Sequence, residues 1–260
     1  MLKKLSIIVS LLMIAAMGIF LTGCGVRGTG EMVTRDIEVT AFTGIRISGS
    51  HSVKFSYADE VSLTVIMQEN LFDHLLIDVE NGELYVRSRR SFITTAVNRP
   101  RLYIAAPSLT AIRLSGSTEI VSSDVIQADN FSIRTSGSAS ITLMLEIAQV
   151  LELETSGSSD IDLDVQAERI NIQSSGSSKF ALNGSANVID WHTSGAARID
   201  AFELQTKTAT VRVSGSANVD VAVVHALTVN ISGSGRVRYI GTPHVTQSVS
   251  GSGSVSRYAP

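Results

Sequence analysis

The sequence predicts an all-β protein: a parallel β-helix (β-solenoid) with an irregular N-terminal β section. Two observations predict this fold. A Ser-Gly-Ser tripeptide recurs through the second half of the chain, and apolar and polar residues alternate on both sides of each glycine. One coil of about 18–21 residues cannot bury its own apolar face, so successive repeats must stack.

Eight glycines define the repeat and follow one another at nearly constant intervals. They are Gly116, Gly137, Gly157, Gly176, Gly195, Gly215, Gly233 and Gly251. A sharp corner between two ladders favours glycine, because its backbone reaches positive φ and tolerates close approach by the next coil. We therefore predict that each glycine lies over the one before it, and that residues 108–260 form the regular solenoid.

The columns around these glycines separate an inside from an outside. Positions four before and four after are almost all apolar, and they include Trp191, which we expect in the core. Positions three before are polar, so Arg134 and Glu154 should pair across adjacent coils. An up-and-down barrel would need a tight hairpin turn after each strand, and the C-terminal half has no regular Asn-Gly or Asp-Gly series.

The N-terminus has the pattern of an export signal. Lys3 and Lys4 precede an apolar stretch over residues 5–20, and Leu21-Thr22-Gly23-Cys24 resembles the lipobox of bacterial lipoproteins. We predict a lipoprotein signal peptide over residues 1–23, lipid attachment at Cys24 and a flexible tether over residues 24–31. The alternative is an ordinary cleaved signal followed by an incidental cysteine. The first reading predicts a protein of the bacterial cell envelope, lipid-anchored to a membrane and facing outside the cytoplasm.

Residues 32–107 carry strand patterns with irregular spacing and should form an N-terminal β section continuous with the solenoid. Ser48-Gly49-Ser50 is an early copy of the corner. Asn81-Gly82 predicts a hairpin, and residues 70–76 predict a short helical or irregular excursion. This section could also cap the end of the solenoid.

Several of these segments resemble a known family. Residues 42–50 and 107–117, together with Glu69-Asn70-Leu71 and Gly82-Glu83-Leu84, are similar to the auto-transporter adhesin head domain, or GIN domain. The resemblance covers roughly residues 36–250. It implies a secreted or surface-anchored bacterial β-solenoid, often a lipoprotein, and it supplies no catalytic residues.

Few residues suggest chemistry. The five histidines (His51, His74, His192, His225 and His244) have no metal-ligand spacing, and we expect them on the surface or in turns. Asp160, Asp162 and Asp164 share one strand face, and the candidate Ca²⁺ ligands Asp162, Asp200 and Asp220 share one column. The competing interpretation is a solvated face on which Arg238 pairs with Asp220. We expect no catalytic residue and no cofactor.

The sequence thus predicts an exported, lipid-anchored β-solenoid that acts as a cell-surface adhesion or structural scaffold module without catalysis. Its expected partners are the membrane, through the lipidated N-terminus, and a surface glycan or matrix protein. The net charge of -3 gives no reason to expect nucleic acid. Two alternatives remain: a lyase-like polysaccharide enzyme, for which Arg198 is the nearby basic candidate, and a self-associating scaffold. The sequence leaves the oligomeric state open.

Overall fold

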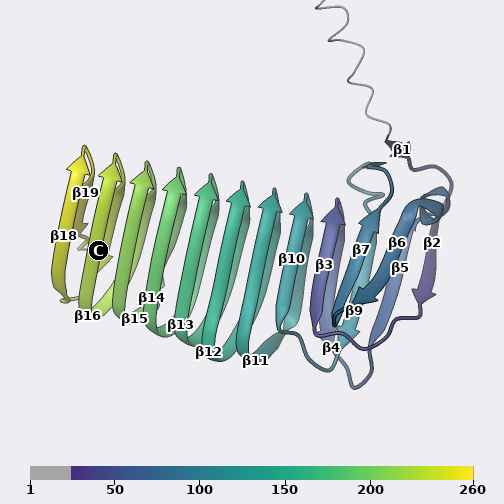
Figure 1. The fold of residues 1–260 in the computed structure, drawn as a ribbon, viewed down its shortest axis with the longest axis horizontal. Coiled ribbons are helices and arrows are strands. Elements are labelled where there is room, and N and C mark those ends of the chain that lie inside the picture. The colour runs from purple at the N-terminus through teal and green to yellow at the C-terminus, as the bar shows by residue number, and fades with distance from the viewer. Residues whose placement is uncertain (1–24, 260) are drawn as a thin grey trace, which may run out of the picture.

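The computed structural model describes residues 25–259 and shows a β-solenoid of about seven turns. Strands make up 74% of it and helix 3%. The coils stand side by side along one axis, with the N-terminal section at one end and the strands β18 (His244–Gly251) and β19 (Ser254–Arg257) at the other (Figure 1). The predicted all-β parallel β-helix is confirmed.

Each regular coil is one long bent strand. The strands after the N-terminal section are β10 (Ala111–Gly116), β11 (Glu119–Gly137), β12 (Ser140–Gly157), β13 (Asp160–Gly176), β14 (Lys179–Gly195), β15 (Arg198–Gly215), β16 (Asn218–Gly233), β17 (Arg236–Ile240), β18 (His244–Gly251) and β19 (Ser254–Arg257). The parallel ladder continues around the bend, and register shifts such as the one between Ala181 and Gly184 absorb the variable coil length.

The glycine corners stack in register. Gly137 pairs with Gly157, which pairs with Gly176. The amide of Ser158 donates a hydrogen bond to the Gly137 carbonyl at 2.8 Å, and the equivalent bond recurs from coil to coil. Gly157 has φ +107°, and a Cβ on it would lie 2.4 Å from the Gly137 oxygen. Glycine is therefore required at this corner both by conformation and by space.

The inward columns form one continuous core along the rod. Trp191 is fully buried, as predicted, and its ring meets Phe180 edge-on at 5.0 Å between centroids. Both side chains belong to β14, one before and one after the bend, so the two arms of a coil close on each other through these rings.

A column of buried hydroxyls lines the inside of the glycine corner. Thr155 donates to Ser174 at 3.0 Å and accepts from Ser178 at 3.3 Å. Thr193, in the same column, is also fully buried, but within residues 25–259 its hydroxyl has no hydrogen-bond partner. The buried corner thus contains both hydrogen-bonded hydroxyls and one without a partner in the described part of the chain.

The N-terminal section begins with the first coil of the solenoid. β3 (Gly44–Gly49) pairs in parallel with β10, and β4 (Ser52–Tyr57) pairs in parallel with β11. Gly49 therefore joins the glycine column directly beneath Gly116, although several strands intervene between them in the chain. The intervening segment builds the end of the rod.

A second coil lies outside the first, so stacking order departs from chain order. β7 (Glu83–Ser88) pairs in parallel with β3, and β9 (Arg101–Ala106) pairs in parallel with β4. The coil of β3 and β4 is thus enclosed between strands that follow it in sequence on both sides (Figure 1). After β9 the chain returns across this coil to begin β10.

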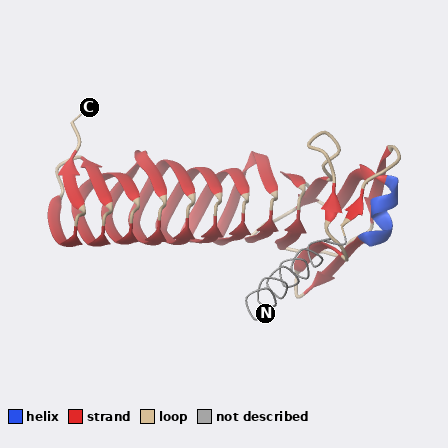
Figure 2. Ribbon diagram, turned by 90° about the horizontal axis from the view of Figure 1, so that it is seen from above, coloured by secondary structure: helices blue, strands red, loops and turns tan. Residues whose placement is uncertain are grey.

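Antiparallel strands then close the end. β2 (Met32–Ile37) pairs with β5 (Ser62–Gln68), β5 pairs with β9, and β6 (Leu75–Glu80) forms a hairpin with β7 across Asn81-Gly82, as predicted. The 3-10 helix η1 (Glu69–His74) lies at this end of the rod (Figure 2) and matches the expected excursion. These elements cover the outermost coil, as an open solenoid requires.

Residues 25–31, predicted as part of a flexible tether, contact the body of the protein. β1 (Val26–Arg27) pairs in parallel with β8 (Phe92–Ile93), and the amide of Thr29 donates to Oδ1 of Asn70 at 2.8 Å. Asn70 donates in turn to the Arg27 carbonyl at 2.8 Å, so this short glycine-rich segment is bound to the body on both sides. The predicted signal peptide and Cys24 lie outside the described residues. No helix within residues 25–259 is long and apolar enough to cross a membrane.

Substituting Gly157 should test the corner. We expect Gly157→Ala to lower the free energy of unfolding by about 2–5 kcal/mol, because it adds left-handed strain to overpacking against Gly137. The matched control is Gly82→Ala, where φ is +75° but nothing lies within 4 Å of the added Cβ. Urea unfolding should show a loss of only about 1–2 kcal/mol for the control. Equal losses would show that close stacking contributes nothing.

The buried hydroxyls provide a second matched pair. Thr155→Val removes a hydrogen-bonded hydroxyl and leaves the hydroxyls of its partners without it. We therefore expect the free energy of unfolding to fall by about 1–3 kcal/mol. Thr193→Val removes a hydroxyl that has no partner and should leave stability unchanged or raise it. Thermal unfolding of the two variants checks this, and the reverse order would contradict the hydrogen-bond assignment.

Candidate functional site

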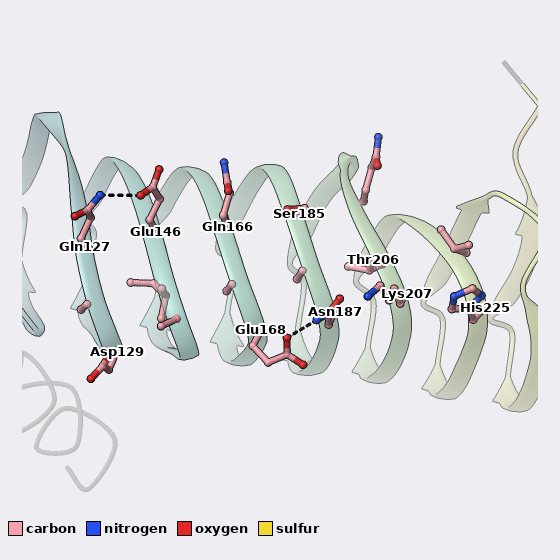
Figure 3. Close-up of a pocket in the computed structure, with 17 residues that line it drawn as sticks. Gln127, Asp129, Glu146, Gln166, Glu168, Ser185, Asn187, Thr206, Lys207 and His225 are labelled. Carbon is pink, nitrogen blue, oxygen red and sulfur yellow. Dashed lines mark hydrogen bonds between the residues drawn. The ribbon is translucent and has the colours of Figure 1, made fainter.

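A groove runs along the bend opposite the glycine corners and crosses five to six coils (Figure 3). Its volume is about 970 Å³. It lies where each long strand turns from one arm of the coil to the other. Because the coils stack in register, each one contributes the same three positions, so the groove has three parallel lanes.

The lanes differ in chemistry. The first rim consists of polar side chains: Gln127, Glu146, Gln166, Ser185 and Gln205. The floor consists of small or buried side chains: Ala128, Ile147, Ala167, Ala186 and Thr206. The second rim carries Asp129, Ala148, Glu168, Asn187, Lys207 and, on the last coil, Val224 and His225. A mostly apolar floor thus lies between two rims on which most side chains can form hydrogen bonds.

The polar rims are partly paired along the axis. Gln127 donates to Glu146 at 2.8 Å, and Asn187 donates to Glu168 (Figure 3). Gln166 and Gln205 are exposed, and neither makes a side-chain hydrogen bond within residues 25–259. An extended polar chain lying in the groove would therefore meet an amide from every second coil.

The sequence did not reveal this groove, although its signal is visible. Gln127, Glu146, Gln166, Ser185 and Gln205 follow one another at an almost constant interval of one coil. Counted back from the following glycine corner, four of them lie ten residues before it, and Glu146 lies eleven before it. The columns that predicted the fold lie within six residues of each corner and do not reach this row.

The acidic column does not assemble into a site. Asp160, Asp162 and Asp164 share the outward face of β13, and Ala181 separates Asp162 from Asp200. Asp200 and Asp220 are direct neighbours. Among the residues described, no group of three His, Cys, Asp or Glu side chains could hold a metal ion.

Asp220 is already engaged by an arginine. Arg238 Nε donates to Asp220 Oδ1 at 2.7 Å, and Nη2 bonds the second oxygen, which raises the pKa of Arg238. The pairing that the column suggested is therefore present. Arg198, the basic candidate of the enzyme alternative, lies on an exposed column next to Lys179 and Asn218.

A ladder of arginines lies on another outward column. Arg46, Arg113 and Arg134 stack on successive coils. Glu83 pairs with both Arg46 and Arg113, and Arg134 pairs with Glu154 at 3.1 Å, as predicted. Partial burial and the two flanking arginines lower the pKa of Arg113. Because two glutamates interleave with three arginines, this ladder is close to neutral.

His51 lies in the corner between β3 and β4, so it is a turn residue, but it is not at the surface. It is fully buried beneath Gly49, with Phe92 6.5 Å from it between ring centroids. Burial lowers the pKa of His51 from 6.5 to about 4, with a smaller contribution from Arg99. His192, His225 and His244 are exposed, and His74 is partly buried.

The periodic fold, with a shallow groove along its bend, defines the chain as a repeat-built β-solenoid. The family described as "Putative auto-transporter adhesin, head GIN domain" matches residues 41–243. The chain belongs to this family, as the sequence resemblance implied. The family and its structural neighbours support an adhesion-type β-solenoid at the cell surface.

Solved structures share the fold over most of the chain. A protein named "Putative lipid binding protein" from Parabacteroides distasonis ATCC 8503 is 26% identical, with a TM-score of 0.83, over 90% of this chain and 99% of its own. A "putative adhesin" from the same organism is 23% identical with a TM-score of 0.80, over 90% of this chain and 100% of its own. A third, from Parabacteroides merdae ATCC 43184, is 19% identical with a TM-score of 0.75, over 90% and 99%. No curated protein matches the chain significantly in sequence.

His51 should make stability depend on pH. Because its pKa is about 4 in the folded chain and 6.5 in the unfolded chain, the unfolded chain binds more protons between these values. The free energy of unfolding should therefore fall by about 3 kcal/mol as the pH drops from about 6.5 to about 4. In His51→Phe this part of the slope should disappear, whereas in His192→Phe, an exposed control, it should remain. An unchanged slope in His51→Phe would contradict the burial of a neutral ring.

Proposed function

We propose that the protein is exported, is anchored to a bacterial membrane by a lipid on Cys24, and acts without catalysis as an adhesion module that binds a surface glycan. Its mechanism is multivalent contact along a rigid rod, with affinity spread over successive coils. The observation that carries the proposal is the groove, because most coils place hydrogen-bonding side chains along it at the coil spacing of about 4.8 Å.

The groove suits an extended sugar chain. Flat sugar rings present apolar faces and hydroxyl edges, which complement a floor of alanines between rows of amides and carboxylates. Asp129, Glu146 and Glu168 make one half of the groove acidic, whereas Lys207 and His225 lie at the other half. This distribution favours a neutral glycan over a polyanionic one. A matrix protein is the other partner that the sequence suggested.

The structure gives less support to the enzyme alternative. A lyase-like reaction needs a basic group placed beside acidic groups that are free to act. Asp220 is bound by Arg238, and Asp162 lies two coils from Asp200. If the enzyme alternative holds, Ca²⁺ should shift the thermal transition and acidic glycans should be shortened.

A glycan and matrix-protein array tests the proposed binding. We expect the protein to bind neutral polysaccharides, and the double variant Gln166→Ala/Gln205→Ala to lose about tenfold or more in affinity, since each lost hydrogen bond costs about 0.5–1.5 kcal/mol. The matched control is Gln173→Ala/Asn230→Ala, which removes exposed amides from the column three before the glycine. Binding that both variants weaken equally would reject the groove, and depolymerised glycan would support the enzyme.

A further inference from the structure

We propose that the N-terminal end of the rod touches the membrane directly through residues 89–97, with arginines on anionic lipid headgroups and Ile93 and Val97 entering the interface. This inference rests on the lipid anchor at Cys24 from the proposed function. It adds a second, non-covalent contact and so fixes which surface of the protein faces the bilayer.

Very little chain separates the lipid attachment point from the body of the protein. Only Gly25 separates Cys24 from β1, and β1 is bound by its pairing with β8. The Val26 amide donates to the Ser91 carbonyl at 2.8 Å, and the Gly28 amide donates to the Ile93 carbonyl at 3.1 Å. An extended chain rises at most about 3.6 Å per residue, so a lipid on Cys24 would hold the start of β1 within about 7 Å of its attachment point, with β8 one strand spacing of about 4.8 Å further away.

Two apolar side chains are exposed on the segment that contains β8. Val97 is 86% exposed and Ile93 53%, and Val97 is the most exposed large apolar side chain within residues 25–259. Ile93 lies over Gly25, because a Cβ on that glycine would come within 2.7 Å of its Cδ1. Exposing isolated apolar side chains is ordinary, but these two lie on the segment that binds the first residues after the anchor.

Positively charged side chains are exposed on β1 and on residues 89–97. Arg27, Arg89 and Arg90 are exposed, and none of them takes part in an ion pair within the described residues. Arg99, by contrast, is held by Glu119 and by the Ser117 carbonyl. Three unpaired guanidinium groups beside two apolar side chains match a membrane interface, where cations bind anionic headgroups and alkyl groups enter the acyl boundary.

Site-directed spin labelling of the lipidated full chain tests the contact. The chain has one cysteine, and acylation consumes its thiol, so Val97→Cys would carry the only free thiol. The matched control is Val224→Cys, because Val224 is 54% exposed and lies on the regular coils. In vesicles of mixed phosphatidylcholine and phosphatidylglycerol, we expect the label at 97 to be reached by oxygen several-fold more than by a water-soluble nickel chelate. The label at 224 should show the opposite ratio.

Neutralising two arginines isolates the charge. Each arginine near an anionic surface contributes about fivefold, so Arg89→Gln/Arg90→Gln should shift the Val97→Cys label toward water by about 25-fold. Vesicles of phosphatidylcholine alone also remove the attraction of Arg27, so without any substitution they should give at least the same loss. An unchanged label in both cases would overturn the role assigned to the arginines.

Mass spectrometry of the N-terminal peptide separates failure of this inference from failure of the anchor. A lipid on Cys24 with a water-exposed label at 97 overturns the contact and leaves the proposed function standing. An unmodified Cys24 overturns the anchor, and the contact with it.

Discussion

Successive coils stack in register at their glycine corners, and this register sets the position of every other column. Each glycine carbonyl accepts a hydrogen bond from the next coil at a distance that leaves no room for a Cβ, so the corners cannot slip by one residue. With the corner fixed, every other column follows: apolar side chains meet apolar side chains, and Arg134 meets Glu154. The rod is a single lattice whose unit is the coil.

The same in-register stacking creates the groove to which we assign the proposed glycan binding. In-register stacking turns one side chain per coil into a row, so the groove needs only a suitable residue type at one position in successive repeats. The drawback is that a mismatch also repeats, as in the three stacked arginines, which the fold relieves by inserting glutamates from β7 and β12.

Much of the fold was predictable from the sequence because each corner glycine pairs with the corner glycine of the next coil, so the glycines show which residues become neighbours. The core position of Trp191, the hairpin at Asn81-Gly82 and the pairing of Arg238 with Asp220 all followed from alternation and turn chemistry. The groove was missed although its polar row keeps a nearly constant distance from the following glycine, because the bend lies about ten residues from the corner and the columns that predicted the fold lie within six. The burial of His51 was also missed, because its cover comes from Phe92, which belongs to no repeat.

The coil of β3 and β4 has a consequence for how the molecule comes to be built. By residue 106 the chain has completed the capped end of the rod, with one face of that coil still unpaired and in register for β10. If the chain crosses a membrane from its N-terminus, the capped end of the rod would therefore fold before the regular coils. Each later coil would then add to a template already in place, as in one-dimensional growth with the slow step at the start.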